Sequence, residues 1–222
     1  MVTIDGPVAA GKSTLAKMVA EQSGYVFLST GLLYRAVAYK VNYLGLTMFA
    51  DEPTIMARVA TEQIYRFRLV DGESRLFLNE QDHTEELRSD RYSLLASKVS
   101  RHQKVREALL KVQQEMGLRG GLVAEGRDTG RVVFPDADLK YFLVADLEFR
   151  ARMRLGDLLR SGIENVSLEQ VREDIRKRDT QDTQGENASL QYVVEDMVKI
   201  DTTDRDLREM AFEIVAKIKS ME

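Results

Sequence analysis

Cysteine is absent from the 222-residue sequence, so disulfides, thiolate metal sites and cysteine nucleophiles are all excluded. Tryptophan is absent too, and the two histidines, His83 and His102, are far apart in the chain. We expect both histidines to be polar surface or helix-side residues, so no histidine-based catalytic or metal site is indicated. Long apolar runs are also missing, because no stretch approaches the roughly 18 consecutive apolar residues that a membrane span needs.

The N-terminal stretch Met1–Pro7 has neither the basic region nor the apolar run of a signal peptide. We therefore expect a cytoplasmic protein with no membrane partner. With 44% apolar and 31% charged residues, the composition is typical of one globular domain with insertions, or of one domain with a small second one. The net charge of −4 predicts no attraction to nucleic acid, so any bound anion must be held by local basic groups.

Strand-like and helix-like patterns alternate in both end regions of the chain. Ser167 and Gln170 have the spacing of a capping box, which indicates a helix start. Strands that alternate with helices predict a parallel sheet covered on both faces, which is an α/β fold. The predicted strands cover residues 2–5, 25–29, 122–125, 139–145 and 197–201, and the predicted helices cover residues 12–23, 31–44, 147–160, 167–178 and 204–219.

The middle of the chain follows a different pattern. Residues 64–79 contain two strand-like runs around Asp71-Gly-Glu-Ser, which predicts an antiparallel hairpin. Charged helices are predicted at about residues 89–99 and 102–116, and together these elements indicate an insertion into the α/β core. A mobile segment is expected between about residues 150 and 182. Residues 177–191 hold almost no apolar side chains, which also predicts exposure and mobility.

One motif indicates the chemistry. The stretch GPVAAGKST matches the phosphate-loop pattern G-x-x-x-x-G-K-[ST] and lies between a predicted strand and a predicted helix. Its glycines permit a tight loop whose backbone N–H groups point at phosphate oxygens, and the helix N-terminus adds positive partial charge. Lys12 would reach the β- and γ-phosphates, and the Ser13 hydroxyl would bind Mg²⁺. We expect these residues to bind a nucleoside triphosphate: Gly6, Pro7, Val8, Ala9, Ala10, Gly11, Lys12, Ser13 and Thr14.

Arginines indicate a second anion site. Any one of them alone is more typical of a solvated surface. Together they are predicted to gather at the carboxyl ends of the strands, where α/β folds bind ligands. A small-molecule kinase needs such a second phosphate clamp, whereas a nucleotide-sensing switch does not. The arginines beside turns or in predicted mobile segments are Arg35, Arg106, Arg127, Arg131, Arg150, Arg152, Arg154, Arg176 and Arg178.

The chain resembles the bacterial cytidylate kinase family over nearly its whole length. The resemblance is carried by the phosphate loop, by STGLLYR at residues 29–35, by EGRDTGRVVFPDA at residues 125–137, by RDTQD at residues 178–182 and by IDTT at residues 200–203. It implies a single nucleoside monophosphate kinase unit with a five-stranded parallel sheet in a three-layer α/β/α core at residues 1–44, 117–146 and 197–222. A monophosphate-binding insertion would cover about residues 45–116, and a helical lid about residues 147–185.

The resemblance further implies transfer of the γ-phosphoryl group of ATP to CMP or dCMP, with Mg²⁺, by a monomer. The acceptor is an ionised phosphate, so no general base is needed, and catalysis would consist of positioning and charge neutralisation. By matching position, Lys12, Arg127, Arg150 and Arg154 would be the catalytic residues, the last two on the lid. The residues implied to bind the monophosphate are Thr30, Tyr34, Arg35, Ser97, Arg106, Arg127, Asp128, Arg178 and Asp182. Of these, Ser97 would reach the cytosine edge, and Arg178 and Asp182 the ribose.

The sequence departs from the family pattern at three places. The family usually has aspartate at Ser29, arginine at Gly185, and a Pro-Leu pair where this chain has Ser189-Leu190. The missing arginine removes charge-assisted donors from the base pocket, which leaves the choice of base open. Two alternatives therefore remain beside cytidylate kinase activity. They are a phosphate-loop kinase with relaxed base choice or another small acceptor, and an ATP-binding regulator without turnover.

Overall fold

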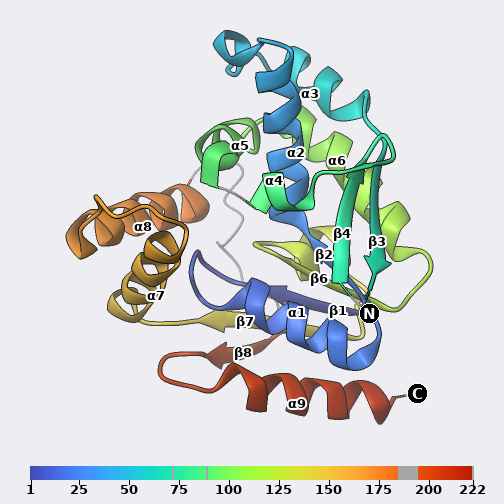
Figure 1. The fold of residues 1–222 in the computed structure, drawn as a ribbon. Coiled ribbons are helices and arrows are strands. Elements are labelled where there is room, and N and C mark those ends of the chain that lie inside the picture. The colour runs from blue at the N-terminus through green and yellow to red at the C-terminus, as the bar shows by residue number, and fades with distance from the viewer. Residues whose placement is uncertain (72, 89, 185–194, 222) are drawn as a thin grey trace. The chain divides into compact units, whose positions relative to one another are not determined.

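The computed structural model describes residues 1–71, 73–88, 90–184 and 195–221 (Figure 1). The chain divides into two compact units. The first consists of residues 20–125 together with Met1, and the second of residues 2–19 and 126–222. Within the described ranges, no helix combines the length and the apolarity that crossing a bilayer requires.

The first unit is mainly helical, with an added antiparallel sheet. Its helices in chain order are α2 (Thr30–Tyr43), η1 (Thr47–Phe49), α3 (Pro53–Thr61), α4 (Thr84–Arg88), η2 (Asp90–Tyr92), α5 (Ser93–Val99) and α6 (Gln103–Gly117). Its strands are β2 (Val26–Ser29), β3 (Tyr65–Val70), β4 (Glu73–Leu78), β5 (Gln81–Asp82) and β6 (Leu122–Gly126), of which Gly126 counts with the second unit.

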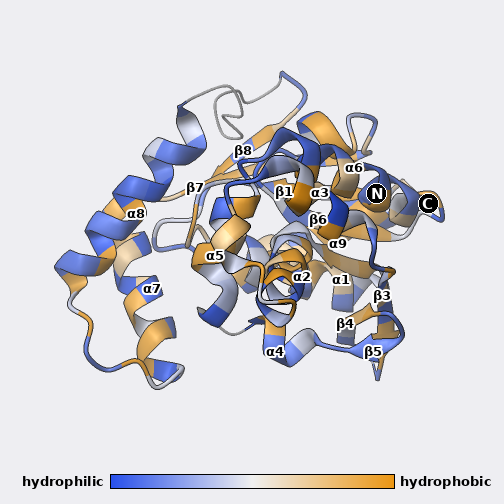
Figure 2. Ribbon diagram, turned by 90° about the horizontal axis from the view of Figure 1, so that it is seen from above, coloured by the Kyte–Doolittle hydropathy of each residue, from blue (hydrophilic) through white to orange (hydrophobic). Residues whose placement is uncertain are grey.

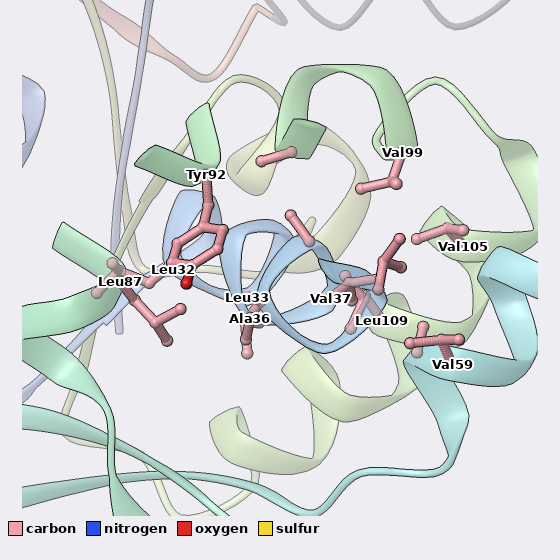
Figure 3. Packing of buried hydrophobic residues seen from close by; sticks show 14 of the residues in the cluster. Leu32, Leu33, Ala36, Val37, Val59, Leu87, Tyr92, Val99, Val105 and Leu109 are labelled. Carbon is pink, nitrogen blue, oxygen red and sulfur yellow. The ribbon is translucent and has the colours of Figure 1, made fainter. Parts of the chain in front are cut away.

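Helix α2 is the centre of the first unit's core. Leu33, Ala36, Val37 and Val41 are wholly buried and recur at helical spacing along one face. Side chains from α3, α5 and α6 surround this helix, as Figure 3 shows for Val59, Val99 and Leu109. The large apolar cluster therefore fixes the orientation of α2, which begins directly after β2.

The second unit contains the phosphate-loop motif and three strands. Its elements are β1 (Val2–Asp5), α1 (Lys12–Ser23), the single π-helical turn η3 (Thr129–Val133), β7 (Leu139–Val144), α7 (Leu147–Arg160), α8 (Leu168–Thr183), β8 (Val198–Asp201) and α9 (Leu207–Lys219). The unit boundary falls within α1, after Val19. Helices α7 and α8 pack side by side (Figure 1), and α8 is hydrophilic along most of its length (Figure 2).

The predicted α/β fold is confirmed. One five-stranded sheet has the strand order β2-β6-β1-β7-β8 and is flanked by helices (Figure 1). Strand pairs β1/β7, β2/β6 and β7/β8 are parallel. The inserted hairpin is also present as β3 and β4, and β5 extends it to a second sheet of three strands. Glu73 and Ser74, which we expected in the hairpin's turn, already belong to β4.

Several element bounds differ from the prediction. The helix expected from residue 89 begins at Ser93, because η2 precedes it, and neither α3 nor α4 was predicted. The capping box is confirmed: Gln170 N donates to Ser167 Oγ at 3.2 Å, and Ser167 N donates to Gln170 Oε1 at 2.8 Å. The helix that it starts runs on to Thr183 rather than ending near Arg178. Residues 150–182, expected to be mobile, are therefore mostly helical.

The polar stretch at residues 177–191 is thus part helix, since its first residues form the last turns of α8. Gly185, Ser189 and Leu190, where the sequence departs from the family pattern, lie outside the described residues. Residue 185 is also the last residue of the predicted lid, so the structure describes the lid only up to residue 184.

Candidate active site

The phosphate-loop motif forms a tight connection between β1 and α1 in the second unit. Gly6 has φ +146°, and a Cβ on it would lie 2.3 Å from the carbonyl oxygen of Leu143, so only glycine fits there. Gly11 has φ +84°, and the helix begins at the next residue. Ala9 adopts a left-handed conformation with φ +59°, which is rare for a residue with a side chain. The loop is therefore shaped by its backbone, as anion binding by N–H groups requires.

Lys12 and Ser13 occupy the first turn of α1. Lys12 is only 5% exposed, and its Nζ donates a 2.6 Å hydrogen bond to the carbonyl of Pro7. The ammonium group is thus held against the loop, beside the positive end of the helix dipole. Ser13 is exposed and offers a hard oxygen ligand of the kind that Mg²⁺ prefers. In the part of the chain that the structure describes, no group of three or more acidic or histidine side chains could hold a metal ion.

Arg127 and Asp182 are brought together by the structure. Arg127 follows β6, Asp182 lies in the last turn of α8, and Arg127 Nε donates to Asp182 Oδ2 at 2.8 Å. Both side chains are about one-fifth exposed, at 21% and 22%. Two residues that the sequence assigned to the phosphate and to the ribose of one acceptor thus lie in contact. Asp128 is the next residue and precedes the π-helical turn η3.

Asp5 is a buried acid that the sequence analysis did not single out. It is the last residue of β1, and its carboxylate accepts hydrogen bonds from the backbone N–H groups of Thr129 and Gly130 and from the Thr129 hydroxyl. Burial raises the pKa of the Asp5 carboxyl to about 6, although these hydrogen bonds act in the opposite direction. The side chain of Asp128 makes no cap hydrogen bond to η3.

Arg150 is buried beside the phosphate loop. Its guanidinium makes a two-pronged ion pair with Asp179 at 3.0 and 2.7 Å, and it also donates to the carbonyl oxygens of Ala145 and Val8. Asp179 is a second residue that the sequence analysis passed over. A signal for it was present, because Asp179 and Asp182 are three residues apart and therefore share one face of α8. Arg150 thus links the lid helices α7 and α8 to the loop.

Two other arginines predicted for the lid region, Arg154 and Arg178, lie on the same helices. Arg154 is half-buried on α7, and Arg178 is half-buried on α8. The lid pair has a small apolar cluster of its own, made of Ala151, Val171 and Ile175. Val8 and Ala9 of the phosphate loop pack against this cluster.

The first unit holds the other residues predicted to bind the monophosphate. Thr30, Tyr34 and Arg35 lie on the first turns of α2, and Arg35 Nη1 donates to the carbonyls of Leu87 and Arg88 at 3.0 and 2.9 Å. Ser97 lies on α5, which packs against α2. Arg106 lies near the start of α6 and is half-buried. All five are carried by helices that contribute to the large core around α2.

Ser29 and Glu125 form a buried polar pair in the first unit. Ser29, the last residue of β2, lies opposite Glu125 near the end of the neighbouring parallel strand β6, and Ser29 Oγ donates to Glu125 Oε1 at 2.6 Å. The position where the family usually has aspartate thus places a neutral donor against Glu125 instead of a second carboxylate. This arrangement avoids like-charge repulsion between two buried acids.

Comparison with known proteins gives a consistent result. The family model described as cytidylate kinase matches residues 2–220. Cytidylate kinase of Geobacter sp. (strain M21) is 42% identical over 183 residues, which is 82% of this chain and 77% of that protein. Cytidylate kinase of Bacillus subtilis (strain 168) is 38% identical over 183 residues, 82% of this chain and 80% of that protein.

Two further matches have a narrower meaning. The bifunctional pantoate ligase/cytidylate kinase of Trichormus variabilis is 41% identical over 186 residues, 82% of this chain but 34% of that protein, so the chain spans about a third of the relative's length. The crystal structure of an uncharacterized protein from Eubacterium ventriosum has a TM-score of 0.55 at 15% identity, covering 99% of this chain and 97% of that one, and supports the fold alone. With a family match from residue 2 to residue 220 and relatives about 40% identical, this chain belongs to the cytidylate kinase family.

Proposed function

We propose that the chain transfers the γ-phosphoryl group of ATP to CMP or dCMP, giving CDP or dCDP and ADP. The observation that carries this proposal is the phosphate loop with Lys12 held against it, in a chain of the cytidylate kinase family. The two short glycine-dependent bends of the loop and the buried ammonium suit a triphosphate. A cytoplasmic monomer acting in pyrimidine nucleotide metabolism is part of the same proposal.

The mechanism consists of positioning and charge neutralisation. The loop N–H groups and Lys12 bind the β- and γ-phosphates of ATP, and Thr14 completes the loop's contacts with the nucleotide. Mg²⁺, held by Ser13 and phosphate oxygens, would supply positive charge to the transferred group. Arg127, Arg150 and Arg154 offset the charge that develops as the phosphoryl group moves. No side chain has to remove a proton, because the attacking oxygen belongs to an ionised phosphate.

On the acceptor side, Thr30, Tyr34, Arg35 and Arg106 bind the phosphate of the monophosphate. Asp128 orients the phosphate-binding arginines or contacts the sugar, and Ser97 contacts the cytosine edge. Arg178 and Asp182 contact the ribose, and Asp182 exchanges its bond to Arg127 for one to a ribose hydroxyl. The second candidate function, kinase activity with relaxed base choice, is favoured by one observation, which is the glycine at residue 185 where the family has arginine.

A coupled assay of ADP release tests the proposal. ATP and Mg²⁺ are supplied with CMP, dCMP, UMP, AMP or GMP offered singly. We expect the highest kcat/KM with the cytidine nucleotides, and comparable turnover of UMP would establish relaxed base choice. No turnover with any of the five acceptors, despite tight ATP binding, would leave an ATP-binding regulator as the remaining interpretation.

Two variants refine the assay. Lys12→Ala should lower kcat by about 100-fold or more because the transition-state charge loses its main cation, whereas the exposed lysine variant Lys111→Ala should have the wild-type rate. Equal activity of the two variants would refute the phosphate role of Lys12. Gly185→Arg should lower the Kd of CMP if the base pocket lacks a charged donor, with AMP affinity as the control.

A further inference from the structure

The carboxylate of Asp5 connects two parts of the active site through one residue. Its main chain leads directly into Gly6, the first residue of the phosphate loop. Its side chain accepts three hydrogen bonds from the turn after β6: from Thr129 N at 2.9 Å and Thr129 Oγ1 at 2.5 Å to Oδ1, and from Gly130 N at 2.8 Å to Oδ2. Asp5 and Thr129 are 0% and 1% exposed, so water cannot replace these bonds.

The turn held by Asp5 has little freedom to adopt another position. A Cβ on Gly130 would lie 2.5 Å from Thr3 Oγ1 and 2.7 Å from Met197 Cε, so the backbone lies directly against side chains of β1 and of the residue before β8. The turn itself is a π-helical one, in which Phe134 N donates to Thr129 O at 2.7 Å. Turns of this kind are uncommon and recur at functional sites.

Arg127 and Asp128 immediately precede this turn. Because they are joined directly to Thr129, the path of the chain through Thr129 and Gly130, which Asp5 holds, sets where their Cα atoms lie. A charged acceptor for two successive N–H groups is stronger than a neutral one and fixes both the position and the direction of the chain. A shift of about 1 Å in a residue that binds the reacting groups can lower a rate by roughly 100-fold.

We propose that Asp5 is a positioning residue that holds the Arg127–Asp128 turn in place for binding of the acceptor phosphate. This inference rests on the proposed kinase function and adds to it a residue that contacts neither nucleotide. The carboxylate does so by binding the two N–H groups and the hydroxyl at the start of η3, while its own main chain begins the phosphate loop.

Asp5→Asn is the first test. The asparagine side chain has the same size as that of aspartate. Its NH2 group, however, faces one of the two backbone N–H groups from which the carboxylate accepts hydrogen bonds, so that bond is lost. We expect kcat/KM for CMP to fall by about 100-fold at a temperature well below the melting transition, while the Kd of ATP changes less than twofold. Unchanged kcat/KM in the folded variant would overturn the proposal. Equal losses of ATP and CMP affinity would also overturn it, because Asp5 would then act through the phosphate loop.

Thr129 supplies variants that keep Asp5 itself intact. Thr129→Val removes the hydroxyl donor with little change in shape, and Thr129→Ser retains it. We expect Thr129→Val to lower kcat/KM for CMP by roughly tenfold and Thr129→Ser to restore most of this loss. Equal kinetics of the two would contradict the role of the hydroxyl bond. Should Asp5→Asn fail to fold, this pair decides the proposal.

A double-mutant cycle shows which residue Asp5 acts through. In an Arg127→Ala background the arginine is already lost, so Asp5→Asn should lower kcat/KM by less than about threefold further. A full additional loss of about 100-fold would mean that Asp5 acts by another route.

Amide hydrogen exchange separates this inference from the proposed function. In Asp5→Asn, exchange of the Thr129 and Gly130 amides should rise at least about tenfold relative to wild type, with α9 as the unchanged reference. If the wild-type chain turns over no acceptor, the proposed function fails and the positioning role fails with it, whereas faster exchange would still show that Asp5 holds the turn. Unchanged exchange together with an active wild type overturns the Asp5 inference alone.

Discussion

The core around α2 and the pair of lid helices are stabilised in different ways. The α2 core buries a large set of apolar side chains from α2, α3, α4, η2, α5 and α6 and from the hairpin strands, and Figure 3 shows part of it around α2. Among the described residues, the cluster between α7 and α8 has Ala151, Val171 and Ile175 as its buried members, with partly buried apolar side chains packed against them. Ion pairs supplement it, among them Arg150 with Asp179 and Arg172 with Glu148.

This difference indicates which part of the site is rigid. Burial of apolar surface is the main stabilising term in folding, so the helices that carry Thr30, Tyr34, Arg35 and Ser97 share the full stability of a large core. The lid pair has few apolar contacts and depends on polar ones, which is typical of segments that open locally. The residues of the first unit that are proposed to bind the acceptor thus lie on the helices of a large apolar core, and those proposed on α7 and α8 lie on helices that share a smaller one.

The largest effect is expected from Leu33→Ala in α2. Leu33 is 0% exposed, and its truncation should lower the free energy of unfolding by about 3 kcal/mol through lost burial and a cavity. Urea denaturation measures this loss, and Leu94→Ala is the control, because Leu94 is 87% exposed. An equal loss in both variants would contradict the description of the α2 core as the rigid part.

Asp179→Asn is expected to have the next largest effect and to act on the lid pair. It removes the negative charge that pairs with the guanidinium of Arg150. The Arg150 side chain is 8% exposed and the Asp179 side chain 27% exposed. We expect a local loss of about 2 kcal/mol, because the guanidinium remains buried without its carboxylate. Hydrogen exchange should therefore quicken in α7 and α8 but not in α2. Uniform quickening over both units would remove the distinction between them.

A matched pair of valines sharpens the comparison. Val37 in α2 and Val171 in α8 are 0% and 3% exposed, so Val→Ala removes the same groups from similar burial. Each should cost about 1 to 2 kcal/mol. The Val37 variant should lower the global unfolding free energy, and the Val171 variant should chiefly raise local exchange in α8. The same exchange pattern for both valines would show that the chain opens as one cooperative unit.

Glu148→Gln should have the smallest effect. Glu148 Oε2 lies 3.6 Å from Arg172 Nε, and the two side chains are 50% and 30% exposed. Solvent screens such a pair, so the loss should be a few tenths of a kcal/mol. Thermal melting at low and high salt measures it. A loss as large as that of Asp179→Asn would mean that surface ion pairs, rather than the buried one, stabilise the lid.

The parts of the fold that the sequence predicted are those set by local signals. Alternating patterns indicated the strands and most helices, and the Ser167–Gln170 spacing gave the start of α8. Helix α3 also had a local signal, because Pro53 occupies its first turn and Met56 and Val59 face the core. The predicted elements took account of neither the proline nor this short apolar face, so α3 was not among them. The end of α8 was missed because its last turn is polar, and helix contacts rather than composition extend it.

The candidate site was predictable where one motif contains the whole feature, as at Gly6–Thr14. Asp5 could not be recognised in this way, because its partners Thr129 and Gly130 are more than a hundred residues away in the chain. For Asp179, the sequence places the acid on one face of a helix with Asp182 but does not say that Arg150 lies opposite. Such pairings depend on how β6, α7 and α8 pack, which no local pattern contains.

Val8 and Ala9 belong to the phosphate loop and also pack against the apolar cluster between α7 and α8. Under the proposed function, opening of the α7–α8 pair uncovers part of the loop, and a nucleotide that holds the loop in place makes this opening more costly. Thermodynamic linkage requires the reverse as well: whatever factor a bound nucleotide adds to lid closure, closure adds to nucleotide affinity. Under the proposed function, the contacts of these two small apolar side chains couple nucleotide binding at the loop to closure of the α7–α8 pair.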